Sequence, residues 1–321
     1  GMAEMGEVAI DGRRIQGDSA IEQNRTRKQI EEEIEQILDE ANEVDEKEDE
    51  EYGPESRGDE LPDELQDKES RLNRLREAKA KLDEKEQRQK ERQREKIQER
   101  EEKERDANNN LRGRKPKPPE KVELDEDARV NITDPESQTM KSRDGWKQGY
   151  NGQTMVDCDT QVIVAQDVTT DANDVEQLEP MLDECREVNE KTPSKVLADA
   201  GYWSKSNAKL EEKHEDLELF IATVKDWKRR KELRERTPPR GPIPDSYGPK
   251  ELMERKLRTK SGRDIYRKRG RSVEPVSGQH VNRDLDRFML RGKQGAEAEW
   301  SLFSATHNLL KLWRERWKSA G

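Results

Sequence analysis

The sequence predicts an α/β fold in which a mixed β-sheet is flanked by helices, and three observations lead to this prediction. Short apolar runs typical of strands recur in the second half of the chain, most clearly at residues 161–169 and 195–203. Segments with helical spacing lie among them, and the order strand, hairpin, helix, strand, helix, strand is that of an α/β layer. One more strand-like run lies near the N-terminus, separated from the others by a long charged region.

The composition indicates that only part of the chain forms a dense core. Of the 321 residues, 43% are charged and 28% hydrophobic, which is too polar for one compact domain of this length. No apolar run approaches the roughly 18–20 residues of a membrane span, and no secretory signal is visible. We therefore expect a soluble, cytoplasmic protein without a membrane partner, in which Cys158 and Cys185 are reduced thiols.

The first strand is predicted at residues 7–16, with a break at Gly12. An apolar run leads directly into Asp11. Two interpretations are open for this aspartate, since Asp-Gly is common in the turns of edge hairpins and a carboxylate at a strand end is also well placed for catalysis.

Residues 19–105 are expected to form a charged helical insertion. Apolar residues recur at helical spacing on a charged background in 19–50 and again in 63–105, and a loop rich in glycine and proline joins the two at 52–62. This pattern predicts an antiparallel helical hairpin, with a solvated charged spacer as the alternative. Residues 106–129 read as a basic, proline-rich linker.

Residues 130–321 have a globular composition and are assigned to the remainder of the core, with a basic insertion at 225–260. The expected elements are a strand at 146–157 interrupted at Gly149 and Gly152, a strand at 161–169, a helix at 174–189, a strand ending on Asp199, a helix at 205–213, a strand at 217–224 and an amphipathic helix at 296–317.

The stretch 196–204 carries the clearest candidate for catalysis. Its apolar run ends on Asp199, and a glycine, two aromatic residues and Ser204, a good helix N-cap, follow. A carboxylate placed where a buried strand turns into a helix can hold a metal ion or activate a water. Asp11 and Glu274 also directly follow apolar residues. We therefore predict that Asp11, Asp199 and Glu274 form one two-metal phosphoryl-transfer site.

A basic block precedes Glu274. Residues 225–271 contain 18 Lys or Arg and 7 Asp or Glu, although the whole chain carries a net charge of -11. The block is either a solvated face or a positive surface for a phosphodiester substrate, and its position beside a candidate metal site favours the second. His307 lies on the apolar face of the last helix and is expected to be a core residue.

Several segments together resemble the DDE transposases of bacterial insertion sequences. They are Val8–Ile15 with Asp11, Gly149-Tyr-Asn-Gly-Gln153, Val196-Leu-Ala-Asp-Ala-Gly-Tyr-Trp203, Arg271-Ser-Val-Glu-Pro-Val276, and Trp300-Ser-Leu-Phe with Thr306-His-Asn-Leu-Leu310. The resemblance implies a ribonuclease-H-like core with a DDE triad on Asp11, Asp199 and Glu274. It also implies two Mg²⁺ or Mn²⁺ ions, DNA partners (the element ends and the target), a homodimer in the DNA complex, and association with the nucleoid when DNA is bound.

The related families carry a tyrosine and an arginine shortly before the glutamate, and Tyr266 and Arg269 are the nearest matches, with Arg271 as the alternative for the arginine. With Arg267, Lys268 and Arg271, these two residues form the expected DNA-binding set. The chain departs from the family in lacking the usual helical end-binding region before the first acid. It also has Gly-Arg-Arg after Asp11, and Val281 where a basic residue is common. These departures fit a truncated copy or an isolated catalytic domain.

The chemistry implied is DNA strand cleavage by water, followed by attack of the freed 3′-hydroxyl on target DNA. Two Mg²⁺ ions held by carboxylates can activate the attacking oxygen and stabilise the leaving oxygen. Three alternatives remain: a truncated or domesticated fragment that only binds DNA or another protein, a nuclease that cuts without joining, and a structural coiled-coil protein. The strand-like runs at 161–169 and 195–203 argue against the last.

Overall fold

The fold is described from a computed structural model, which covers residues 4–52, 63–106, 113, 115–142, 145–214 and 216–319. The chain divides into two compact units. The core unit combines Gly1–Asp18 with Gln138–Gly321, and the inserted unit is Ser19–Ser137. The inserted unit therefore extends beyond the helical segments, through residues that the sequence analysis assigns to a linker and to the start of the core. The predicted loop at 52–62 lies almost wholly outside the described residues.

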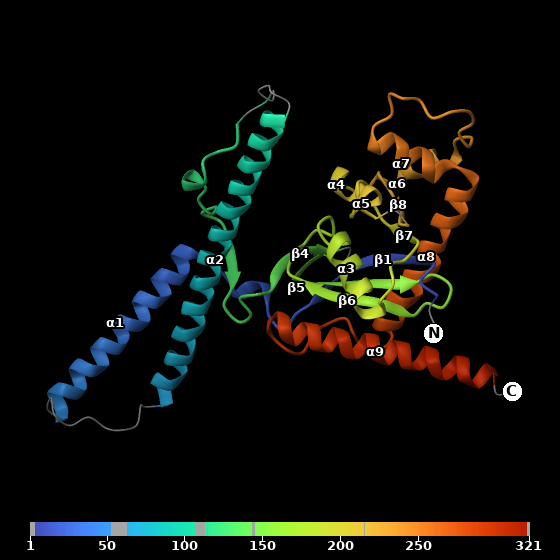
Figure 1. Cartoon of the computed structure of the whole chain (residues 1–321). Helices are drawn as coiled ribbons and strands as arrows, with labels where there is room; N and C mark the ends of the chain where they lie inside the picture. The colour runs from blue at the N-terminus through green and yellow to red at the C-terminus, as the bar shows by residue number, and fades with distance from the viewer. Residues whose placement is uncertain are drawn as a thin grey trace. The chain divides into compact units, whose positions relative to one another are not determined.

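The core unit is built on a mixed sheet, as the sequence predicts (Figure 1). Its strands are β1 (Glu7–Gln16), β4 (Gln138–Ser142), β5 (Gly145–Asp157), β6 (Ile163–Thr169), β7 (Lys195–Ala198) and β8 (Glu218–Ile221). The order across the sheet is β4-β5-β1-β7-β8, and β6 also pairs with β5. β1 runs antiparallel to β5 and parallel to β7, and β7 runs parallel to β8. This arrangement is consistent with a ribonuclease-H-like core.

β5 is one continuous strand, so the predicted interruptions at Gly149 and Gly152 are wrong. The predicted break in β1 at Gly12 is wrong as well. The glycines allow close approach instead of ending strands. A Cβ on Gly149 would lie 2.0 Å from the carbonyl oxygen of Ile15, and one on Gly152 would lie 3.0 Å from the ring of Trp300.

Helices cover both faces of the sheet. One face packs against α3 (Leu178–Asn189) through a core that includes Val8, Ile10 and Met181. The other face packs against α8 (Lys260–Val281) and, further along β1, against α9 (Gly292–Ser319). Side chains alternate between the two faces along a strand, so Ala9 points toward α8 while its neighbours point toward α3.

The remaining helices of the core unit are short. They are α4 (Lys205–Ala208), α5 (Leu210–Lys213), α6 (Trp227–Glu235) and α7 (Pro249–Arg258). α4 begins after Ser204, whose hydroxyl accepts a hydrogen bond from the Asn207 amide, as expected for an N-cap. α3 begins at Leu178, four residues later than predicted, because residues 171–177 form a turn in which the Gln177 amide donates to the Asp174 carbonyl.

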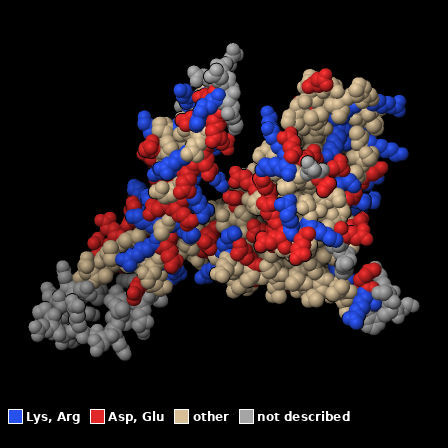
Figure 2. Space-filling model, in the orientation of Figure 1, with Lys and Arg blue, Asp and Glu red and all other residues tan. Residues whose placement is uncertain are grey.

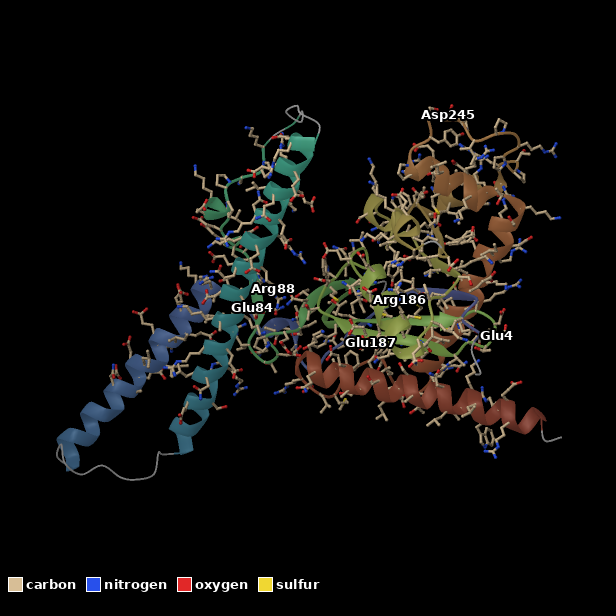
Figure 3. The ribbon with its side chains drawn as sticks, in the orientation of Figure 1. Glu4, Glu84, Arg88, Arg186, Glu187 and Asp245 are labelled. Atoms are coloured by element: carbon tan, nitrogen blue, oxygen red, sulfur yellow. The ribbon has the colours of Figure 1, made fainter. Side chains whose placement is uncertain are left out.

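The inserted unit contains the predicted antiparallel helical hairpin. Its elements are a 3-10 turn (Ile21–Gln23), β2 (Asn24–Thr26), α1 (Arg27–Tyr52), α2 (Asp63–Asp106), a second 3-10 turn (Pro119–Lys121) and β3 (Arg129–Asn131). Ion pairs join α1 to α2 in antiparallel order, including Glu31–Lys79 at 2.8 Å. Glu84 and Arg88 form another pair along α2 (Figure 3).

A small apolar core makes the inserted unit more than a solvated spacer. Its residues come from both helices and from β3 and the residue that follows it, and they are Ile30, Leu75, Ala78, Leu82, Val130 and Ile132. The two ends of the unit meet, since the hydroxyls of Ser19 and Ser137 are 3.3 Å apart. Among the described residues of both units, no helix is long and apolar enough to cross a membrane.

His307 is a core residue, as predicted: it is fully buried, and its Nε2 lies 2.8 Å from the Gln161 carbonyl oxygen. A second buried histidine, His280, lies beside it, with ring centroids 6.1 Å apart. Burial, followed by the nearby His307, Arg13 and Arg283, lowers the pKa of His280 to about 4.

We expect this histidine to make the protein less stable in mild acid. Because the pKa of His280 is about 4 when folded and about 6.5 when unfolded, the unfolded chain binds more protons between these values. The free energy of unfolding should therefore fall by up to about 3 kcal/mol as the pH drops from about 6.5 to about 4. Urea denaturation across this pH range measures the slope, which should be shallower in His280→Gln; equal slopes would contradict the assignment.

Candidate active site

Asp11 and Asp199 come from neighbouring parallel strands. Asp11 lies in β1 two residues after Ala9, so it shares the face that points toward α8. Asp199 directly follows β7, and the register pairs Ala9 with Leu197. Because the two strands run parallel in this register, the two carboxylates reach the same edge of the sheet on the same face.

Arg269 joins the two acids. It projects from α8, and its Nη2 lies 2.7 Å from Oδ1 of Asp11 and 3.9 Å from Oδ2 of Asp199. The Arg269 side chain is 15% exposed, whereas those of Asp11 and Asp199 are 28% and 38% exposed. The acids are therefore open to a ligand, while the arginine that holds them is mostly enclosed.

The pKa of Asp11 is raised to about 6. Burial is the largest cause, and Arg269 opposes it by stabilising the carboxylate. The negative charges of Asp199 and Asp174 raise the pKa further. A further cation close to the Asp11 carboxylate would therefore favour its ionised form.

Glu274 lies five positions beyond Arg269 on α8, and its Oε1 would contact a Cβ placed on Gly270 at 3.2 Å. It lines a pocket of about 520 Å³ together with Arg269. Other residues lining this pocket come from the segment after β8 and from α6, α7 and α8, and the basic ones are Arg230, Arg258, Arg263 and Arg267. Figure 2 shows Lys and Arg side chains along the region where Figure 1 places α7 and α8.

The structure brings Asp11 and Asp199 together on one cation but does not join Glu274 to them. Among residues 4–319 as far as they are described, no three His, Cys, Asp or Glu side chains are grouped closely enough to hold a metal ion. The donors that are present still suit a hard divalent cation, since carboxylate oxygens are its preferred ligands.

The other residues of the predicted DNA-binding set have varied partners. The Tyr266 hydroxyl donates to the Ala198 carbonyl at 3.2 Å, which ties α8 to the end of β7. Lys268 pairs with Glu7 at 2.8 Å and with Asp159 at 3.4 Å. Arg267 lies 3.7 Å from Asp264, and Arg271 is exposed.

A polar cluster behind the two acids escaped the sequence analysis. Asp174 lies at its centre, just before α3. Its Oδ1 accepts hydrogen bonds from Asn151 at 2.8 Å and Gln153 at 3.0 Å, and its Oδ2 accepts one from Arg14 at 2.9 Å. Tyr202 donates in turn to Oε1 of Gln153. The sequence signal for this cluster is the segment 149–153, which contains Asn151 and Gln153.

A comparison with models of protein families matches residues 125–309 to the family described as "Transposase DDE domain". The match contains Asp174, Asp199, Arg269 and Glu274 but begins after Asp11. The place of Asp11 beside Asp199 therefore comes from the structure, through the sheet register and the shared Arg269. No curated protein and no solved structure gives a match.

Proposed function

The chain belongs to the family of transposase DDE domains, and from that premise we propose that it cleaves and joins DNA strands with Asp11, Asp199 and Glu274 as its catalytic acids. The observation that carries the proposal is the pair of carboxylates on adjacent parallel strands that share Arg269. The pairing of β1 with β7 brings these acids together, since Asp11 lies in β1 and Asp199 is the first residue after β7.

Each residue has a distinct part in this proposal. Asp11 and Asp199 would hold divalent cations (Mg²⁺ or Mn²⁺), and Glu274 would complete the ligands from α8. When bound, two such ions activate an attacking oxygen and stabilise the leaving oxygen at a phosphodiester. Arg269 keeps the two aspartates together and adds positive charge beside the scissile phosphate, while Tyr266 holds α8 against β7 through the Ala198 carbonyl.

DNA is the proposed partner, both as element ends and as target. The basic pocket beside Glu274 offers guanidinium groups of the kind that bind phosphates. Arg267, Lys268 and Arg271, on the same helix as Arg269, extend this positive surface. We further propose that two copies act together in the DNA complex, and that the reaction takes place in the cytoplasm, at the nucleoid.

The proposal is tested by calorimetry with Mn²⁺ and Mg²⁺ on the full chain. The wild type is expected to bind, and Asp199→Ala and Glu274→Ala are expected to bind much more weakly. Asp183→Asn, which changes an exposed acid on α3, serves as the control. If the two variants bind like the wild type, the three acids do not form the metal site.

The pH dependence of metal binding is a separate prediction. Because a metal ligand must be deprotonated and the pKa of Asp11 is about 6, affinity should fall as the pH drops through about 6. Arg269 lowers this pKa, so Arg269→Gln should move the midpoint to higher pH. Calorimetry between pH 5 and pH 8 measures both midpoints, and unchanged midpoints would argue against Asp11 as a ligand.

The alternative is a fragment that binds DNA without cleaving it. One observation favours it: Asp11, Asp199 and Glu274 are not gathered into one group in the described structure. Incubating the protein with supercoiled plasmid DNA and Mn²⁺ distinguishes a cleaving enzyme from a DNA-binding fragment. Binding of the plasmid without nicking supports the DNA-binding fragment. Joined products separate a transposase from a nuclease that only cuts.

A further inference from the structure

We propose that Asp174 is a positioning residue that locks the two acid-bearing strand ends together. The inference rests on the proposed function only in taking Asp11 and Asp199 as catalytic. Asp174 belongs to the turn before α3, so it comes from neither of the strands that carry these acids.

Both carboxylate oxygens of Asp174 are committed to protein groups. Oδ1 accepts from the side-chain amides of Asn151 and Gln153 on β5, and Oδ2 accepts from Arg14 on β1. Arg14 also donates to the Ala172 carbonyl at 2.7 Å, which closes the turn back onto β1. Three donors hold this carboxylate, whose side chain is only 10% exposed, so Asp174 is a rigid anchor between the turn and the two strands.

Asp174 lies close to Gly12, the residue after Asp11, and to Gly201, the second residue after Asp199. A Cβ on Gly12 would lie 2.3 Å from Oδ1 of Asp174, and a Cβ on Gly201 would lie 3.0 Å from Oδ2. Only glycine lets both segments approach the carboxylate this closely. The Gly201 amide meanwhile donates to Oδ1 of Asp199 at 2.7 Å, so the position of Gly201 sets the orientation of Asp199.

The chain of contacts therefore runs from Asp174 through Gly12 to Asp11, and through Gly201 to Asp199. Tyr202 adds to this chain of contacts, because its hydroxyl donates a hydrogen bond to Gln153. Burial raises the pKa of Tyr202 well above the usual value, so the hydroxyl keeps its proton and remains a donor. Residues that orient metal ligands in this way typically contribute 10- to 100-fold to metal affinity or activity.

The test uses the full chain, Mn²⁺ and supercoiled plasmid DNA. In Asp174→Asn the side chain keeps its shape but loses the charge that holds Arg14. We expect kcat for nicking to fall about 10- to 100-fold and Mn²⁺ affinity to weaken, with KM for DNA unchanged. Arg14→Gln should produce the same split between kcat and KM. Asp183→Asn, an acid on the exposed face of α3, should leave both unchanged.

Failure of this inference is distinguishable from failure of the proposed function. A wild type that neither binds Mn²⁺ nor nicks DNA refutes the function itself. A wild type that nicks, with Asp174→Asn nicking equally well, overturns the positioning role alone. If Asp174→Asn lowers Tm, activity is measured at a temperature at which the variant is still folded. If kcat then equals that of the wild type, Asp174 contributes to stability only, and the inference is overturned.

Discussion

Replacing Asp11 with asparagine is expected to reduce metal-dependent DNA cleavage by at least about 10³-fold. The substitution keeps the size of the side chain and an oxygen for Arg269, whose Nη2 lies 2.7 Å from Oδ1 in the wild type. It removes the negative charge that would hold a divalent cation, so the loss should appear in the chemical step more than in DNA binding. Single-turnover nicking of supercoiled plasmid with Mn²⁺ measures the rate, and filter binding measures the affinity for DNA.

The matched control for this prediction is Asp159→Asn. Asp159 is 75% exposed and pairs with Lys268 on the same helix that carries Arg269. The Asp159→Asn substitution also removes one negative charge near α8, but it leaves the ends of β1 and β7 unchanged. Activity of Asp11→Asn within a few-fold of the wild type would show that Asp11 is not catalytic, which would leave Asp199 and Glu274 without the first acid of a DDE triad.

The largest effect on stability is expected for Gly149→Ala. The new Cβ would lie 2.0 Å from the Ile15 carbonyl oxygen and 2.6 Å from the Gly17 amide nitrogen. Both contacts are to backbone, so they cannot be relieved by rotating a side chain. β1 and β4 pair with β5 at this residue, and the strain would force them apart. We expect a loss of about 3 kcal/mol or more in the free energy of unfolding.

Gly278→Ala provides the comparison for this effect. A Cβ at this position on α8 meets nothing within 4 Å, and alanine favours the helix by about 1 kcal/mol over glycine. Urea denaturation should therefore give opposite shifts for the two alanine variants. A midpoint for Gly149→Ala close to that of the wild type would mean that β5 can move away from β1 at little cost.

The positions of the two aspartates could be predicted because they follow from local patterns. Apolar runs mark β1 and β7, and the alternation of side chains along a strand places Asp11 and Asp199 on one face once the strands are paired in parallel. The hairpin of β5 and β6 and the long helices likewise follow from the short-range spacing of apolar residues. These features need no knowledge of distant contacts.

The rest depended on contacts between residues far apart in sequence. Gly149 looks like a strand break, and only the approach of the Ile15 backbone shows why β5 continues through it. Asp174 looks like a helix-start residue, yet its partners on β1 and β5 hold it in a turn. The pairing of Arg269 with Asp11 spans 258 positions, and no local pattern encodes it.

The meeting of Ser19 with Ser137 bears on how this chain folds. β1 must find β5 across more than a hundred residues, a separation that ordinarily slows folding and costs closure entropy. If the helical hairpin folds first, its ends come together at the two serines and the remaining span is short. This shortcut removes about 2 kcal/mol of loop-closure entropy from the search. Folding of the inserted unit would then shorten the search by which β1, the strand that carries Asp11, pairs with β5. The rate of this pairing would be set by a part of the protein that carries none of the proposed catalytic acids.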